Sequence, residues 1–83
     1  LLPEVEIGPN PFRDIVRFRV SEAAPGNLKN FELYDLYGRQ VLSKSLGDRT
    51  EWTIRGEALA SGTYVFSIHF EDGRIATGKL IRF

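Results

Sequence analysis

The chain has 83 residues, of which 11 are Lys or Arg and 11 are Asp or Glu, so its formal net charge is zero. A balanced charge provides no long-range field to draw in nucleic acid or an anionic membrane. The sequence contains no cysteine, which excludes disulfides and thiolate metal sites. No stretch approaches the ~18 apolar residues of a membrane-spanning helix, and no signal-peptide pattern is present.

A chain of 83 residues has room for one domain, which buries roughly 60–65% of its unfolded surface. Its core is therefore thin, and it has little surplus stability for a strained catalytic cleft. The sequence also contains no methionine, not even at position 1. We therefore expect residues 1–83 to form a single domain excised from a larger protein.

Turn signals recur about every ten residues, which is typical of an all-β sandwich. The segment Gly8-Pro9-Asn10-Pro11 ends a first predicted strand at residues 2–7, because proline disfavours helical geometry around it. A second strand is predicted at 13–21. Pro25-Gly26 is typical of a type II turn. By their alternation, the second-strand residues predicted to enter the core are Val16, Phe18 and Val20.

Three further strands are predicted at residues 29–37, 39–46 and 50–55, separated by Gly38 and by Gly47-Asp48. Residues 57–60 have the composition of a single helical turn but are too short to form one alone, so we expect them to make a corner that brings Leu59 into the core. In the fourth strand, Val41 and Leu42 face opposite sides of the sheet. The third-strand and fifth-strand residues predicted to enter the core are Phe31, Leu33, Trp52 and Ile54.

Residues 59–83 are predicted to form a hairpin that closes the chain. Its first strand alternates, and the residues on the predicted core face are Tyr64, Phe66, Ile68 and Phe70. Asp72-Gly73 predicts a type I′ turn, after which residues 74–81 return antiparallel. Seven short strands in fewer than 100 residues indicate an all-β fold, a seven-stranded antiparallel immunoglobulin-like β-sandwich without the paired cysteines of antibody domains.

Residue patterns indicate no catalytic, metal or cofactor-binding site. His69, the only histidine, falls on the solvent side of its strand and has no partners for a metal set or a nucleophile. Ser61 lacks the Gly-x-Ser-x-Gly frame of a nucleophile elbow and is interpreted as a turn residue. Nothing places Asp14 and Asp35 together in a cleft, and aspartates at strand ends commonly cap turns.

Two groups of side chains leave a binding role open. An aromatic platform for sugar would consist of Trp52, Tyr34 and Tyr37, although a Trp in a thin sandwich is more often part of the core. A basic surface would consist of Arg17, Arg19, Lys79 and Arg82. Acidic neighbours such as Glu22 and Asp14 dilute this charge, and no aromatic residues are interleaved with it, so nucleic-acid binding is not expected.

Four motifs in order resemble the C-terminal sorting domain, type A, of the Por (type IX) secretion system, and they span nearly the whole chain. They are Pro9-Asn10-Pro11-Phe12, Leu33-Tyr34-Asp35-Leu36-Tyr37-Gly38-Arg39-Gln40-Val41, Leu59-Ala60-Ser61-Gly62-Thr63-Tyr64-Val65 and Gly78-Lys79-Leu80-Ile81-Arg82. The ordered set, more than any single motif, carries the resemblance. A related sandwich in flagellar hook-capping proteins shares several of these features, which supports the same fold.

The resemblance implies a C-terminal secretion signal that directs an upstream parent cargo through the outer membrane to the cell surface or medium, after transit of the periplasm. Its implied partners are the outer-membrane translocon and a sortase-like peptidase that cleaves the signal off, and the cargo is often then attached to lipopolysaccharide. No catalysis and no cofactor are implied. The family's recognition role maps onto Gly62, Tyr64, Val65, Gly78, Lys79, Leu80, Ile81 and Arg82. Phe83 departs from the pattern by following the basic position at which many members stop.

Recognition of this kind can occur by β-augmentation of the terminal strand, with Lys79 and Arg82 setting the register on the partner. In the competing interpretation, the two cations only protect an edge strand from self-association, and an open edge also allows a homodimer. The sequence predicts that replacing both cations by Ala leaves folding nearly intact and reduces export. The alternative function is an immunoglobulin-like or fibronectin-like adhesion or carbohydrate-binding module, which would persist in the mature protein.

Overall fold

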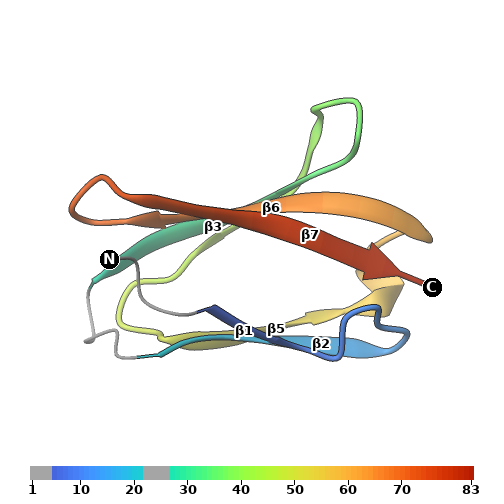
Figure 1. Ribbon diagram of the computed structural model, residues 1–83, viewed down its shortest axis with the longest axis horizontal. Helices are drawn as coiled ribbons and strands as arrows, with labels where there is room; N and C mark the ends of the chain where they lie inside the picture. The colour runs from blue at the N-terminus through green and yellow to red at the C-terminus, as the bar shows by residue number, and fades with distance from the viewer. Residues whose placement is uncertain (1–4, 22–26) are drawn as a thin grey trace.

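The structure, a computed structural model, describes residues 5–21 and 27–83. Within these ranges, seven strands form two antiparallel sheets that lie face to face (Figure 1). This arrangement confirms the predicted all-β, immunoglobulin-like sandwich. The predicted turn at Pro25-Gly26, the acidic neighbour Glu22 and the beginning of the first predicted strand lie outside the described residues.

The smaller sheet consists of β1 (Val5–Gly8), β2 (Ile15–Val20) and β5 (Glu51–Arg55), in the order β1-β2-β5. Strict alternation in β2 buries its three apolar core residues and exposes the arginines between them, as predicted. Strand β5 pairs with β2 so that Phe18 lies opposite Trp52. The larger aromatic side chains of this sheet therefore lie together on its inner face.

The larger sheet consists of β3 (Leu28–Tyr34), β4 (Gln40–Ser45), β6 (Gly62–Phe70) and β7 (Ile75–Arg82). Its strand order is β4-β3-β6-β7, which places the last strand at one edge. A 3-10 turn, η1 (Gly56–Ala58), carries the chain from the smaller sheet to the larger one, and Leu59 follows it into the core as expected. Each predicted strand is present, and its described ends lie within three residues of the predicted ones.

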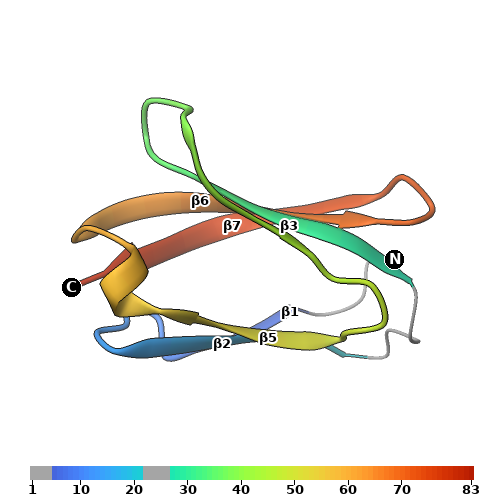
Figure 2. The same cartoon turned by 180° about the vertical axis from the view of Figure 1, so that it is seen from behind.

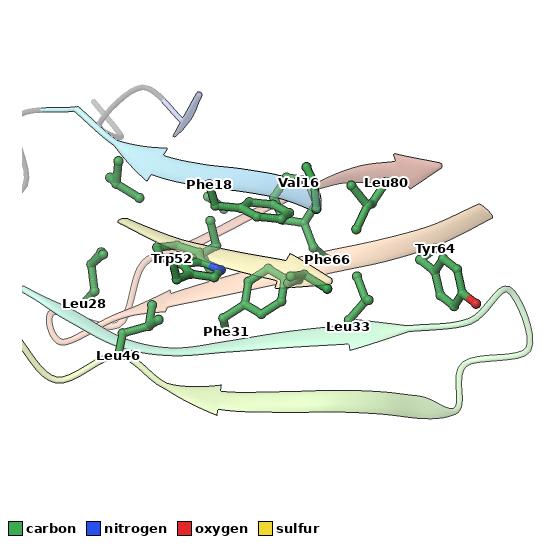
Figure 3. Close-up of a cluster of buried hydrophobic side chains, with 14 of the residues drawn as sticks. Val16, Phe18, Leu28, Phe31, Leu33, Leu46, Trp52, Tyr64, Phe66 and Leu80 are labelled. Carbon is green, nitrogen blue, oxygen red and sulfur yellow. The ribbon is translucent and has the colours of Figure 1, made fainter. Parts of the chain in front are cut away.

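Aromatic side chains from both sheets meet in the core (Figure 3). The rings of Phe18 and Trp52 stack with centroids 5.5 Å apart, and Phe66 meets Phe18 edge-on at 5.2 Å. Only 4% of Trp52 is exposed, so the prediction of a core Trp is confirmed and the alternative of a sugar platform that includes it is wrong. The indole Nε1 of Trp52 has no hydrogen-bond partner among the described residues, so ring packing alone holds this side chain.

The third strand ends earlier than predicted, at Tyr34, because Asp35 begins a turn. One Asp35 carboxylate oxygen accepts the backbone N–H groups of Tyr37 and Arg39, and Gly38 adopts a φ of +83°. The connection from β3 to β4 projects from the larger sheet, as Figure 2 shows in green. Leu36 and Tyr37 at its tip are 67% and 87% exposed.

The closing hairpin differs from the predicted two-residue type I′ turn. The N–H of Gly73 donates to the carbonyl of Phe70 at 3.0 Å, and the N–H of Phe70 donates to the carbonyl of Arg74 at 2.9 Å. Gly73 lies at a φ of +93°. This is a three-residue loop, a type I turn followed by a left-handed glycine, in which Asp72-Gly73 still makes the reversal but Glu71 joins the loop.

Candidate functional site: the last two strands

The eight residues of the predicted recognition set lie together on β6 and β7. The two strands pair in antiparallel register, with Tyr64 opposite Leu80 and Val65 opposite Lys79. Because side chains alternate across a strand, this set divides between the inner and the outer face of the larger sheet. The two groups have different surroundings and must be described separately.

Residues of the set on the inner face are part of the core. Leu80 is fully buried and Tyr64 is 7% exposed, with its hydroxyl donating to the carbonyl of Ala60 at 2.6 Å. Gly78 lies beneath the ring of Phe66, where an added Cβ would come within 2.6 Å of a ring carbon. These residues therefore shape the fold, and a partner cannot reach Tyr64 or Leu80 while the domain is folded.

The outer face of these strands exposes Val65 and Ile81, each 36% accessible, with Lys79 directly opposite Val65. Lys79 is exposed, and no ion pair involves it within residues 5–21 and 27–83. An exposed ammonium flanked by two aliphatic side chains is accessible to a partner that carries an acidic and apolar surface.

Arg82 faces the interior end of the sandwich, unlike Lys79. Its Nε donates to the carbonyl of Gly56 at 2.9 Å, and its Nη1 donates to the oxygen of Phe83. Gly56 is itself enclosed, because an added Cβ would lie 2.1 Å from the Arg13 carbonyl oxygen and 2.8 Å from the Arg82 Nε. Arg82 therefore ties the last strand to η1, where the chain crosses between the sheets.

The outer edge of β7 is partly covered by residues 10–12, which connect β1 to β2. The Asn10 side chain donates from Nδ2 to the Lys79 carbonyl and accepts the Ile81 N–H, both at 3.0 Å. Phe12, only 1% exposed, forms a parallel bridge with Arg82, donating its N–H to the Ile81 carbonyl and accepting the Phe83 N–H, both at 2.9 Å. Figure 1 shows this blue connection beside the arrowhead of β7.

Sequence reasoning included Asn10 and Phe12 in a motif but assigned them no role. The only available signal was a carboxamide between two prolines, a side chain with the same donor and acceptor pair as a backbone amide. The two hydrogen bonds of Asn10 reach residues that lie 69 and 71 positions further along the chain. No local sequence pattern reveals contacts at such a separation.

His69 lies on the outer, solvent-facing side of the larger sheet, as predicted, and it is half-buried and hydrogen-bonded there. Its Nε2 lies 2.9 Å from the Glu32 carboxylate and 3.1 Å from the Ser67 hydroxyl. The Tyr34 hydroxyl donates to the same Glu32 oxygen, and this hydrogen bond raises the pKa of Tyr34 above its ordinary value. The four side chains form a polar cross-strand network that joins β3 to β6.

The remaining candidates have structural contacts. The Ser61 hydroxyl donates to the oxygen of Phe83 at 2.7 Å, which confirms a turn residue that also holds the end of β7. Asp35 pairs with Arg39 at 2.8 Å within its turn. Desolvation tends to raise the pKa of Asp35, but the N–H groups of Arg39 and Tyr37 and the Arg39 guanidinium outweigh it, so the pKa lies below the ordinary value.

The predicted basic surface does not form, because its members lie on different sheets. Arg17 and Arg19 point outward from the smaller sheet, and Arg19 lies 3.6 Å from the Glu6 carboxylate. Lys79 points outward from the larger sheet on the other side of the sandwich. Within residues 5–21 and 27–83, no cluster of three or more His, Asp or Glu residues could hold a metal ion, and no helix is long and apolar enough to cross a membrane.

Fold and site together define a small immunoglobulin-like β-sandwich that presents its last strand at a sheet edge. Among solved structures, CopC from Methylosinus trichosporium OB3b is similar, with a TM-score of 0.50 and 21% identity over 95% of this chain and 91% of that chain. This likeness concerns the fold alone. No curated protein sequence matches the chain.

The family described as "Secretion system C-terminal sorting domain" matches residues 6–82, and the chain belongs to this family. Such domains are the C-terminal sorting signals of the type IX secretion system, so the resemblance found from the motifs is confirmed. A signal of this kind belongs to a larger cargo protein, interacts with the secretion machinery, and implies export to the cell surface or extracellular space.

Proposed function

We propose that the type IX translocon in the outer membrane recognises this domain through the outer face and the edge of β7. One observation carries this proposal: the last strand is the outermost strand of the larger sheet, so Lys79 and the part of the β7 backbone that residues 10–12 leave uncovered are accessible from outside the described part of the domain. Recognition combines backbone pairing along the edge with the charge of Lys79 and the aliphatic surface of Val65 and Ile81.

Of the eight predicted recognition residues, the proposal assigns direct contact to three: Val65, Lys79 and Ile81. Gly62, Tyr64, Gly78 and Leu80 act by giving β6 and β7 their shape. Arg82 acts by anchoring the end of β7 to Gly56 rather than by contacting the partner.

Membership of the family supports the wider pathway that we propose. Residues 1–83 form one sorting domain of a larger exported cargo, which crosses the periplasm before the translocon binds the signal. A sortase-like peptidase then removes the domain, and the cargo is released or attached to lipopolysaccharide. The edge that the translocon reads also allows a homodimer of isolated domains, because an accessible strand edge pairs readily with a second copy.

The test is a fusion of a Sec signal and a fluorescent reporter to residues 1–83, expressed in a bacterium with a working type IX system. Three versions are compared: the intact domain, the domain lacking residues 78–83, and Lys79→Glu. The folded charge variant is essential, because removing residues 78–83 also removes core contacts of Leu80.

Export of the intact fusion, with retention of Lys79→Glu in the periplasm as a folded protein, would support the proposal. Equal export of the intact and charge-reversed fusions would exclude Lys79 from recognition. Periplasmic retention of the intact fusion would contradict the sorting function and favour the adhesion-module alternative.

A further inference from the structure

The backbone groups at the edge of β7 are not equally accessible along its length. In an antiparallel strand, alternate residues direct both N–H and C=O to the same side. The carbonyl of Lys79 and both backbone groups of Ile81 are hydrogen-bonded to residues 10–12, whereas by the same alternation Ile75 and Thr77 direct theirs to the open side. Among the described residues, therefore, nothing is hydrogen-bonded to the edge of β7 in its first half, and this is the part that offers an uncovered edge to a partner strand.

The cover has two parts that differ in how firmly they are held. Phe12 is an anchor, because its ring is buried in the core and its backbone makes two hydrogen bonds, one to Ile81 of β7 and one to Phe83 just beyond it. Asn10 is exposed and reaches β7 only through its side-chain amide. Rotation of this one side chain uncovers the Lys79 carbonyl and the Ile81 N–H while Phe12 remains in the core.

The carboxamide of Asn10 takes the place of the N–H and C=O of one residue in an added parallel strand. It donates one hydrogen bond and accepts another at alternate residues of β7, which is what the backbone of a neighbouring strand would do. A strand arriving at Ile75 and Thr77 can therefore continue along β7 only by taking the two hydrogen bonds that Asn10 makes.

We propose that Asn10 is a removable cap on the edge of β7, and that an extended segment of the translocon displaces it when the segment pairs with Ile75 to Ile81. This inference rests on the proposed function and adds the chemical nature of the contact, which is main-chain pairing, and the residue that competes with it. Displacement exchanges two hydrogen bonds for two equivalent ones, so the cap limits premature edge pairing and lowers the affinity for the translocon only by the population of the capped state.

Backbone amide exchange of the 83-residue chain, resolved by NMR, tests the cap directly. Asn10→Ala removes both hydrogen bonds, and we expect it to accelerate exchange of the Ile81 N–H about fivefold while the Leu80 N–H, which faces β6, is unchanged. Asn10→Asp keeps an acceptor for Ile81 but loses the donor to Lys79, so its effect is smaller. Asn30→Ala, on β3, is the matched control, since no hydrogen bond of the Asn30 side chain exists among the described residues.

Affinity for the detergent-purified translocon, measured on the same four proteins, tests the competition. If the capped domain cannot bind the translocon, its apparent affinity is reduced in proportion to the fraction of uncapped molecules. Amide exchange of Ile81 depends on the same fraction. Asn10→Ala should therefore raise the affinity for the translocon by the same factor as the exchange rate, about fivefold. Equal or weaker binding of Asn10→Ala, or an unchanged Ile81 exchange rate, would overturn the cap. Absence of binding by all four proteins would instead refute the proposed function, and the cap with it.

Discussion

The inner and outer faces of the last two strands belong to one sequence motif but have different physical roles. On the inner face, Tyr64, Gly78 and Leu80 have packed surroundings that leave no access for a partner. On the outer face, Lys79 and Ile81 are exposed and make no side-chain hydrogen bond among the described residues. Loss of export therefore has one cause in an inner-face variant, a misfolded strand, and another in an outer-face variant, a lost contact with the partner. Only a stability measurement separates the two.

Gly78→Ala should produce the largest effect, because its new methyl group would collide with the Phe66 ring. We expect a loss of about 1–3 kcal/mol of unfolding free energy, measured by urea denaturation. Thr77→Ala, the exposed neighbour, is the control and should change stability much less. In a double-mutant cycle, Gly78→Ala should lower the free energy of unfolding much less in a Phe66→Leu protein than in the wild type. An equal loss in the two proteins would show that the added methyl group does not collide with the Phe66 ring.

Arg82→Ala tests whether the second cation of the motif acts on the inner side, as its contacts indicate. Losing its hydrogen bonds to the Gly56 carbonyl and the Phe83 oxygen should lower stability by about 1–2 kcal/mol. Arg82→Lys keeps the charge but not the planar donor fork, so it should restore only part of the loss. If Arg82→Ala leaves the free energy of unfolding unchanged, Arg82 instead contacts the partner, as the sequence predicted.

Lys79→Ala tests the outer face alone. Stability should stay within about 0.5 kcal/mol of the wild type, because this side chain is exposed and lies outside every ion pair of the described residues. Affinity for the translocon should fall about two- to fivefold at low salt, and the difference should shrink as salt is raised. A salt-independent affinity would show that charge plays no part in recognition.

The smallest expected effect concerns the hairpin turn that leads into β7. The Arg74 N–H bonds to the Asp72 carboxylate and, with the Arg74 charge, holds the pKa of Asp72 below its ordinary value despite some desolvation. A lowered pKa in the folded state stabilises the fold above the ordinary value near 3.8, and this contribution is lost as pH falls through the folded value.

Asp72→Asn should therefore lower the melting temperature slightly at about pH 6, and its effect should shrink as pH falls below the ordinary value of the Asp72 pKa and the wild-type carboxyl becomes protonated in both states. The same comparison with Asp48→Asn, an exposed aspartate in another turn, is the control. An effect of Asp72→Asn that does not shrink as pH falls would exclude an ionised carboxylate as its cause.

Local alternation was enough to predict much of the fold. Val16, Phe18, Trp52 and Phe66 face the core as expected, because burying one face of a strand fixes the side of every second residue. The predicted end of the third strand was wrong because hydrogen bonds from a polar side chain, and not hydrophobic alternation, determine the backbone conformation there. Asp35 ends β3 early by binding two N–H groups, a contact that strand periodicity does not encode.

Much less of the site was predictable. The motif located β6 and β7 correctly, but it did not distinguish Lys79 from Arg82, since both are basic residues on one short strand. Their separation of three positions puts them on opposite faces of β7, and only the folded chain shows that the carbonyl of Gly56 binds the inward Arg82. The network that holds His69 also depends on the pairing of β3 with β6, which brings Glu32 within 2.9 Å from 37 positions away.

The parallel bridge between Phe12 and Arg82 also determines how the domain bears mechanical load. When one end of the chain is pulled by an attached polypeptide and the last strand is held, tension runs along two neighbouring parallel segments in opposite senses. The hydrogen bonds that join residues 10–12 to β7 then share the load in shear rather than opening one by one. A domain built in this way resists traction at its two termini before its core is disturbed, a property suited to a handle by which a larger protein is drawn across a membrane.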